Sequence, residues 1–372
     1  MLKKHPDYIL AFIILIFLIL GVLILYSVSA PISQERFGTS FYYLKRQVLL
    51  GFLPGITLGF FFYQIPLNSL KKITPFFFFA NLIFLAMVFL PKIGLSIGGA
   101  SRWISLGPIS FQPSEFLKIS FIMYLGAWLS KNENFQDKRQ GEKKWNEKIR
   151  IAAFLIIIGV IVTTLILQPD FSTMALIVAV GVLMFFSGKT PFWATALIML
   201  LIFGSFILLL HFAPYRLARI KVFLNPEIDP LGIGYQSRQS LIAVGSGGIS
   251  GLGLGMSLQK LGFLPHPLAD SIFSVFAEET GFVGSLILTL LFLIFFWRGI
   301  EISKKSSSNF LKLVALGTSS WLTLQAFWHI GSLIGILPLS GIPFPFISYG
   351  ASHLIVEFIG VGILLNVSRH TN

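Results

Sequence analysis

The chain has 372 residues, of which 55% are hydrophobic and only 12% are charged, and its mean hydropathy is +0.83. This charged fraction is about half of the roughly 25% that is usual in soluble domains, so the composition excludes an ordinary soluble protein. Apolar runs such as residues 8–28 and 282–297 approach or exceed the length that crosses a bilayer core of about 30 Å. We therefore predict an all-α polytopic membrane protein.

Apolar stretches in chain order predict a bundle of about ten transmembrane helices. We place them at about 8–28, 44–63, 73–91, 113–130, 151–168, 171–187, 191–211, 272–297, 310–336 and 346–367. The first run is too long for the apolar core of a signal peptide, so we expect an uncleaved anchor. No internal repeat is visible, and we expect a single domain over residues 1–372. Its largest loop, at about 212–271 between spans seven and eight, is expected to be extracytoplasmic.

The distribution of basic residues indicates the orientation. With ten spans, both termini lie on one side of the membrane. The termini and loops of that side hold sixteen Lys and Arg, seven of them in residues 131–150, whereas the short loops of the other side hold about five. Since Lys and Arg collect in short cytoplasmic loops, we predict that both termini are cytoplasmic. The same bias accounts for most of the net charge of +13, so we expect no nucleic-acid partner.

Polar residues within the expected helices are informative because each is costly in a membrane and usually faces the bundle interior or water. Glu115 and Lys118 lie three residues apart near the start of the fourth helix, so they share a face and can pair. A structural ion pair and a functional role both remain open for them. Asp170 directly precedes the sixth helix, where it can act as an N-cap.

Asp270 stands where a proline-rich loop becomes a long apolar helix, in the stretch "LPHPLADSIFSVFAEETGFVG". On a continuous helix, Glu278 would lie about 12 Å along the axis and roughly 80° around it from Asp270. Glu279 would lie near the opposite face. Paired glycosidase carboxylates lie roughly 5 to 9.5 Å apart, so this spacing argues against a paired-acid hydrolase. We expect Glu278, and likewise Glu357, to face protein rather than lipid.

Two other common kinds of site find no support. The glycines of "GLGLG" (251–255) lack the preceding strand and following helix of a nucleotide-binding loop, and close backbone packing explains them better. The six histidines show no zinc-site spacing, and the chain has no cysteine. We therefore expect no dedicated zinc site.

Five long motifs together resemble the FtsW/RodA/SpoVE family, the SEDS proteins. They are "GASRWISLGPISFQPSEFLKIS" (99–120), "QPDFST" (168–173), "NPEIDPLGIGYQSRQSLIAVGSGGISGLGLGMSLQKLGFLP" (225–265), "IFSVFAEETGFVG" (272–284) and "GILPLSGIPFPFISYGAS" (335–352). They follow the family's order over nearly the whole chain. The resemblance implies a peptidoglycan glycosyltransferase that polymerises lipid II at the outer face of the bacterial cytoplasmic membrane, for cell division or for elongation and shape.

The resemblance also implies site residues. Asp270 matches the family's proposed catalytic aspartate, and a positioned carboxylate can accept the proton of an attacking sugar hydroxyl. The leaving group would be a diphosphate, which cationic side chains bind well, although headgroup binding is an equal alternative for the loop arginines. The expected substrate-binding residues are Arg102, Glu115, Lys118, Arg216, Arg219, Lys221, Gln259, Lys260, Ser348 and Tyr349.

The chain departs from the family beside Asp270, where "PLADSIF" replaces the common His-Thr-Asp-Phe. The flanking polar residues either only tune the site, or activity here is altered. Ala351 also stands where glycine is usual. The stretch at 253–265 is more similar to division-type FtsW and that at 335–350 to RodA and SpoVE, so the prediction leans to the division type.

The resemblance implies a class B penicillin-binding protein as partner transpeptidase, with other divisome or elongasome membrane proteins. The sequence points to no particular cofactor, although a divalent cation, Mg²⁺ or Mn²⁺, can assist the departing diphosphate. Two other functions stay open. A lipid II flippase or other transporter would show an inverted repeat, and none is visible. A non-catalytic scaffold that recruits the transpeptidase would tolerate loss of Asp270.

Overall fold

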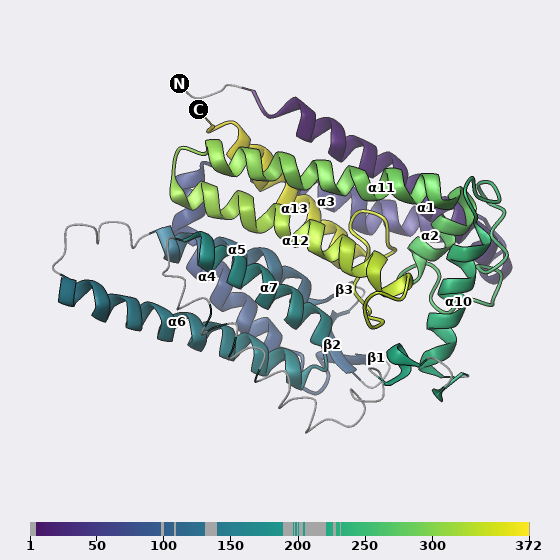
Figure 1. Cartoon of the computed structure of the whole chain (residues 1–372), viewed down its shortest axis with the longest axis horizontal. Helices are drawn as coiled ribbons and strands as arrows, with labels where there is room; N and C mark the ends of the chain where they lie inside the picture. The colour runs from purple at the N-terminus through teal and green to yellow at the C-terminus, as the bar shows by residue number, and fades with distance from the viewer. Residues whose placement is uncertain are drawn as a thin grey trace.

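The computed structural model describes residues 5–97, 100–107, 109–130, 140–188, 221–225, 228–230 and 232–371, with 196, 198, 200 and 204. This part of the chain is a bundle of long helices lying side by side (Figure 1). A small sheet and the longer described loops lie at one end of the bundle, and both chain termini lie at the other. We call these the loop end and the terminal end.

The helices agree closely with the sequence prediction. They are α1 (Tyr8–Phe37), α2 (Tyr42–Gln47), a π-helical turn (Val48–Phe52), α3 (Leu53–Gln64), α4 (Leu67–Met87), α5 (Pro113–Ser130), α6 (Gln140–Leu167), α7 (Phe171–Ser187), α10 (Ile233–Ser246), α11 (Ile272–Lys305), α12 (Asn309–Leu333) and α13 (Ala351–Ser368). Six helices of the described residues are long and apolar enough to cross a membrane, counting α2 to α3 as one. Each expected helix has a counterpart except 191–211, nearly all of which lies outside the described residues.

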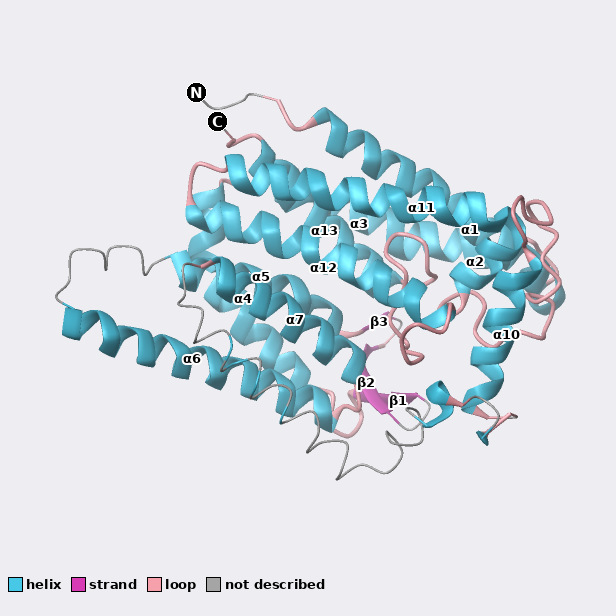
Figure 2. Ribbon diagram, in the orientation of Figure 1, coloured by secondary structure: helices cyan, strands magenta, loops and turns pink. Residues whose placement is uncertain are grey.

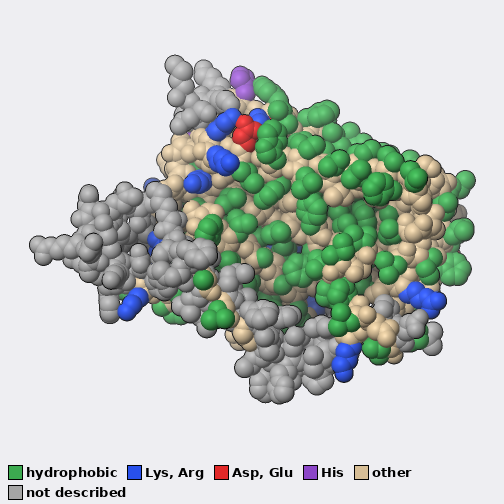
Figure 3. Space-filling model, in the orientation of Figure 1, with side chains coloured by type: hydrophobic (Ala, Val, Ile, Leu, Met, Phe, Trp, Pro, Cys, Tyr) green, Lys and Arg blue, Asp and Glu red, His purple; other side chains and the backbone are tan. Residues whose placement is uncertain are grey.

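The surface of the bundle is that of a multi-pass membrane protein. Hydrophobic side chains are spread over the whole described surface in Figure 3, and the few charged side chains lie mostly towards its margins. Large apolar side chains are widely exposed along the helices, such as Phe12 on α1, Phe76 on α4 and Ile156 on α6. A helical face of this kind is stable against lipid, and the prediction of an all-helical polytopic membrane protein is confirmed for the described helices.

A three-stranded antiparallel sheet at the loop end was not predicted (Figure 2). Its strands are β1 (Gly94–Ile97), β2 (Ala100–Leu106) and β3 (Ile109–Phe111), in the order β1-β2-β3. Gly107 begins the two-residue connection between β2 and β3 with a φ of 69°, which glycine adopts without steric cost. The sequence predicted only a loop here, because strands this short carry little periodicity.

Helix α11 is broken at Gly281, whose φ of 67° and ψ of −164° lie outside the helical range. Backbone N–H groups of residues 252–253 donate to the carbonyls of Glu278 and Glu279, at 3.0 Å each. The two N–H groups after Gly281 donate to the carbonyls of residues 248–249, at 2.9 and 3.1 Å. The glycine-rich segment thus supplies the hydrogen bonds that the helix loses, as close backbone packing of these glycines predicts.

The two termini meet at the terminal end. The Asp7 carboxylate caps α1 through the N–H of Leu10 at 2.9 Å and pairs with Arg298 of α11 at 2.5 Å. The N–H of Asp7 donates to the Ser368 hydroxyl near the end of α13, at 3.0 Å. The described ends of the chain therefore lie at the same end of the bundle, as an even number of spans requires, and their cytoplasmic orientation stays a prediction.

Candidate functional site

Asp270 lies half-buried in a turn at the loop end, directly before α11. The next side chain, Ser271, is fully buried; its hydroxyl donates to the Pro265 carbonyl at 2.9 Å and accepts from Gln236 of α10 at 3.1 Å. The N–H of Ser271 donates to the His266 carbonyl at 3.3 Å. The turn is thus bonded both within itself and to α10, which fixes the backbone that carries Asp270.

The loop between α12 and α13 (residues 334–350) packs against this turn. The N–H of Tyr349 donates to the Leu268 carbonyl, and the Ser348 hydroxyl donates to the Ala269 carbonyl, each at 2.8 Å. Ser348 is fully buried, so the structure gives it a role in joining the two loops. Tyr349 is half-buried, and burial raises the pKa of its phenol.

Gly341 is the residue of the α12–α13 loop that faces Asp270. A β-carbon built on Gly341 would lie 3.7 Å from Oδ2 of Asp270 and 4.0 Å from Oδ1. Chain neighbours aside, these two oxygens are the only described heavy atoms within 4 Å of that position. The sequence motif at 335–352 contains Gly341 but gave no sign that it meets the carboxylate.

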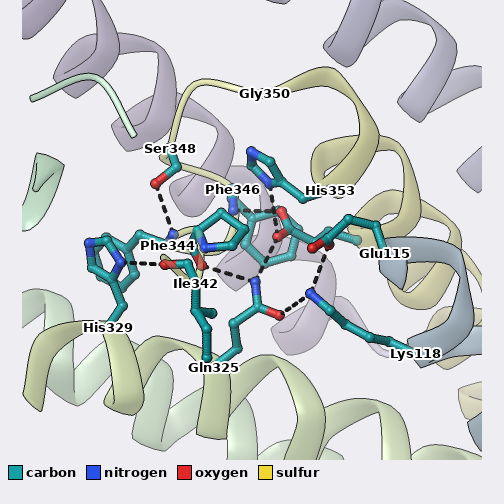
Figure 4. A network of polar contacts seen from close by, with 12 residues as sticks. Glu115, Lys118, Gln325, His329, Ile342, Phe344, Phe346, Ser348, Gly350 and His353 are labelled. Atoms are coloured by element: carbon teal, nitrogen blue, oxygen red, sulfur yellow. Dashed lines mark hydrogen bonds and ion pairs between the residues drawn. The ribbon is translucent and has the colours of Figure 1, made fainter. Parts of the chain in front are cut away.

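A buried polar network lies beneath the α12–α13 loop (Figure 4). Gln325 of α12 donates to the Pro343 carbonyl at 3.0 Å and to Glu357 of α13 at 3.4 Å. Glu357 accepts from the N–H of Phe346 at 2.8 Å, and its other oxygen lies 3.1 Å from His353 Nδ1. Glu357 is fully buried, so the prediction that it faces protein is confirmed.

Glu115 and Lys118 join the network from α5. Their ion pair is 2.7 Å long, Lys118 also donates to Gln325 at 2.9 Å, and its ammonium lies 5.7 Å from the centre of the Trp321 ring. The predicted pairing is confirmed. The side chains are 3% and 1% exposed, so in this arrangement they support the loop from inside and do not reach a substrate directly.

Two further side chains hold the backbone of the same loop. His329 Nδ1 lies 2.8 Å from the Ile342 carbonyl, and its ring stacks on Phe344 with centroids 4.9 Å apart. Gln47, directly before the π-helical turn, accepts from the Gly350 N–H at 3.0 Å and donates to its carbonyl at 3.4 Å. Such π-helical turns are frequent at functional sites. The loop therefore receives bonds from α2, α12 and α13.

The sequence alone could have indicated that these supporting residues face the bundle interior. Gln325 and His329 are four apart in α12, and His353 and Glu357 are four apart in α13, so each pair shares one face of an apolar helix. Such intramembrane polar residues point to the bundle interior. Their common target, the backbone of the α12–α13 loop, follows only from the tertiary arrangement.

Lys260 forms a second buried cluster with α11. Its ammonium lies 2.6 Å from Glu279 and donates to the carbonyls of Ser27 at 3.1 Å and Gly255 at 2.8 Å. An ammonium has three N–H donors, so all of them are used. Direct substrate binding by Lys260 would require this cluster to open.

The two glutamates inside α11 face protein. Glu278 is 1% exposed, so the prediction that it faces protein is confirmed. Its carboxylate accepts from the Ser257 hydroxyl and from the N–H of Leu258 at 3.1 Å. Glu279, for which the sequence offered no explanation, is the partner of Lys260. Both glutamates therefore attach the segment before Asp270 to the broken helix.

Asp170 precedes α7 but makes no side-chain capping bond, so the predicted capping role is wrong. Its carboxylate instead accepts from the Ser114 hydroxyl at 3.0 Å and the Gln112 amide at 3.5 Å, which bind it to the start of α5. Arg102 of β2 donates to the Gln168 carbonyl at 3.1 Å and to the next carbonyl. Some of the guanidinium N–H donors that were expected to bind diphosphate are therefore already bonded to these carbonyls.

The other expected substrate-binding residues are less constrained. Lys221 is exposed, and Gln259 is half-buried with a side-chain oxygen that has no partner in the described structure. Arg216 and Arg219 lie outside the described residues. Within the described residues, no group of three or more His, Asp and Glu side chains could hold a metal ion.

The fold and site together define a multi-pass helical membrane protein with a fixed acidic turn at one end of its bundle. Residues 8–372 match the FtsW/RodA/SpoVE family of cell cycle proteins. The chain is 37% identical over 370 residues to stage V sporulation protein E of Bacillus subtilis, covering 99% of this chain and 98% of the relative. It is 36% identical over 357 residues to a probable peptidoglycan glycosyltransferase FtsW of Coxiella burnetii, covering 95% and 94%. The chain belongs to the FtsW/RodA/SpoVE family.

Solved structures show the same fold. A chain from a structure on the coordination of polymerisation and crosslinking by a peptidoglycan synthase complex superposes with a TM-score of 0.77 at 25% identity, covering 98% of both chains. The rod shape determining protein RodA of Thermus thermophilus superposes with a TM-score of 0.69 at 23% identity, covering 98% of this chain and 97% of RodA.

Proposed function

We propose that this protein is a peptidoglycan glycosyltransferase that polymerises lipid II into glycan strands, with Asp270 as the general base. Relatives similar over nearly their whole length are named as peptidoglycan glycosyltransferases. The observation that carries the assignment of the base is the Asp270 turn, which α10 and the α12–α13 loop hold by hydrogen bonds on both sides of the carboxylate. A base held in this way can be positioned against a substrate hydroxyl.

The reaction needs one carboxylate. The acceptor hydroxyl oxygen attacks the anomeric carbon of the donor sugar, its proton passes to Asp270, and the bond from that carbon to the diphosphate oxygen breaks. The diphosphate leaves as an anion, so no second carboxylic acid is needed to protonate the leaving group. This agrees with the sequence prediction that Asp270 has no partner carboxylate on its helix at the spacing of a glycosidase pair. Positioned proton transfer of this kind contributes typically 10²- to 10⁴-fold in rate.

Cations at the loop end would stabilise the leaving diphosphate. Lys221 is exposed, and Arg102 lies at the loop end on β2. Lys118 and Lys260 are instead paired inside the protein. The first two are therefore the better assignments among the four expected cations that the structure describes.

The loop end would face the outside of the bacterial cytoplasmic membrane, with both termini in the cytoplasm. The bias of Lys and Arg towards the loops of the terminal side supports this orientation. We further propose that a class B penicillin-binding protein crosslinks the strands, since a structural relative comes from a complex that coordinates polymerisation and crosslinking. A division role is preferred to elongation.

Lipid II polymerisation by the purified protein with its transpeptidase, whose active serine is blocked, tests this function. We expect glycan strands from the wild type, and at least 100-fold fewer from Asp270→Asn if the carboxylate is the base. Asp229→Asn is the matched control, because Asp229 lies in the same large loop and binds the Gly232 N–H at 3.0 Å, a contact that asparagine can keep.

Each other outcome points to a different function. Equal products from the wild type and Asp270→Asn would remove Asp270 from the chemistry. No strands from folded wild type, with lipid II crossing the bilayer of liposomes, would indicate a transporter. No strands and no transport, with the transpeptidase still bound, would indicate a scaffold.

A further inference from the structure

Gly341 stands opposite the carboxylate of Asp270 without filling the space between them. We infer that the missing side chain of Gly341 keeps open the face of Asp270 at which the acceptor sugar hydroxyl is bound and deprotonated. The α12–α13 loop would then be a fixed wall of the acceptor site. This inference rests on the proposed function and adds to it the place where the acceptor meets the base.

The distances define the space. A hydroxyl that donates to a carboxylate lies about 2.5 to 3.0 Å from the acceptor oxygen. A β-carbon at Gly341 would lie 3.7 Å from Oδ2 and 4.0 Å from Oδ1, with no other described heavy atom within 4 Å except chain neighbours. A methyl group there would therefore contact Asp270 without a clash and occupy part of the volume that an incoming hydroxyl needs.

Neither backbone conformation nor packing explains the glycine. Gly341 is not among the residues with positive φ, so alanine can adopt its conformation. By contrast, a β-carbon on Gly281 would lie 2.3 Å from the backbone nitrogen of Gly251, and one on Gly59 would lie 2.7 Å from the Phe358 carbonyl oxygen. Those glycines are required by close packing, whereas Gly341, its chain neighbours aside, borders only the Asp270 carboxylate among the described residues.

The wall is fixed by bonds that begin at the next residue. His329 lies 2.8 Å from the Ile342 carbonyl, and Gln325 donates to the Pro343 carbonyl at 3.0 Å. A few residues on, Glu357 accepts from the Phe346 N–H at 2.8 Å. These supporting side chains come from α12 and α13, so both helices determine where Gly341 stands relative to Asp270. They are positioning residues and do not touch the substrate.

The pH dependence of polymerisation reports directly on this contact. Among the described residues, the titratable side chains on the elements packed around the Asp270 turn include His266 within it, Tyr349 in the α12–α13 loop, and Tyr235 and Arg238 on α10. A substitution at Gly341 changes none of these groups. A methyl group beside the carboxylate removes water and disfavours its charged form, which raises the pKa of Asp270.

The test compares Gly341→Ala with Gly245→Ala in the full-length protein with its blocked transpeptidase. Gly245 lies on α10 at the same end of the bundle, and a β-carbon there has nothing within 4 Å. For Gly341→Ala we expect kcat to fall on the order of 10- to 100-fold. The acidic limb of the kcat/KM profile should move up by roughly one unit. Gly245→Ala should match the wild type in both.

Gly341→Ser separates a site effect from general damage. A serine hydroxyl can donate to Oδ2 and favour the charged carboxylate, so its acidic limb should lie below that of Gly341→Ala. Both variants should unfold at the wild-type temperature. If the wild type polymerises lipid II and both variants keep its kcat and pH profile, the inference is wrong while the function stands. If either variant loses activity only in proportion to lost folded protein, the inference is equally overturned. If the wild type makes no strands, the proposed function itself fails.

Discussion

At the scale of single residues, Lys260 shows how a buried charge is stabilised. Its three donors are used by Glu279 and by two backbone carbonyls from α1 and the glycine-rich segment. The two charged side chains are each 3% exposed. Removing one member of such a pair leaves the other charge buried without compensation, which costs more than the pair contributes to stability.

We predict that Lys260→Met lowers the free energy of unfolding by about 3 to 5 kcal/mol, measured by denaturant titration in detergent micelles. Lys305→Met is the matched control, because Lys305 is 49% exposed in its pair with Glu301. It should cost at most about 1 kcal/mol. Adding Glu279→Gln to Lys260→Met should restore part of the loss. Equal small losses in the two lysine variants would show that the buried Lys260 pair contributes no more to stability than the exposed Lys305 pair.

At the scale of elements, the α12–α13 loop depends on α13 for its position. Glu357 accepts the Phe346 N–H and also contacts Gln325 and His353. Replacing it with leucine leaves these groups unpaired, at about 1 to 3 kcal/mol for each buried donor. Because Gly341 lies in the same loop, the effect should reach the Asp270 site as well as the stability of the bundle.

We predict that Glu357→Leu lowers kcat for lipid II polymerisation about 10-fold or more while KM stays within about twofold, since Glu357 does not touch substrate. Asn366→Leu is the control on the same helix. Asn366 donates to the carbonyls of Phe62 at 3.0 Å and Ile65 at 2.7 Å, at the terminal end. Both variants should be less stable, but Asn366→Leu should keep the wild-type kcat per folded protein. Equal kcat losses would show that Glu357 acts only through general stability.

The elements also show what a sequence can and cannot predict here. Apolar length located nine of the ten expected helices, and spacing predicted the Glu115 and Lys118 pair, because both depend on local periodicity. The break at Gly281 and its filling by residues 247–253 could not be predicted, since "EETGFVG" is compatible with a continuous helix. The partner that makes a break favourable lies about thirty residues earlier in the chain.

The candidate site was predictable only in part for the same reason. The motif around Asp270 was visible, and so were several polar residues within the helices. Gly341, which faces the carboxylate from the other loop, is separated from Asp270 by the whole of α11 and α12. Lys260 was expected to bind the substrate, but it lies inside the protein in an ion pair with Glu279. The sequence could not predict this pair, since nothing in the loop around Lys260 indicates a buried glutamate as its partner.

At the scale of the whole molecule, the proposed chemistry depends on which end of the bundle faces outwards. Asp270 lies at the loop end, and Arg298 and Lys305 lie with the termini at the other. Lipid II polymerised outside the cell could reach Asp270 only if the loop end faces outwards. The chain has no cysteine, so a single introduced cysteine is its only thiol, and a labelling reagent reports the accessibility of that position alone.

We predict that Ser250→Cys reacts with a membrane-impermeant maleimide in intact cells, and that Ser307→Cys reacts only after permeabilisation. Both serines are exposed; Ser250 is at the loop end, and Ser307 donates its N–H to the His370 carbonyl at 3.3 Å at the terminal end. Each change replaces one hydroxyl by a thiol, so the reactivities are comparable. The reverse pattern would place Asp270 in the cytoplasm. Polymerisation at the outer face would then be impossible for this site, whatever its geometry.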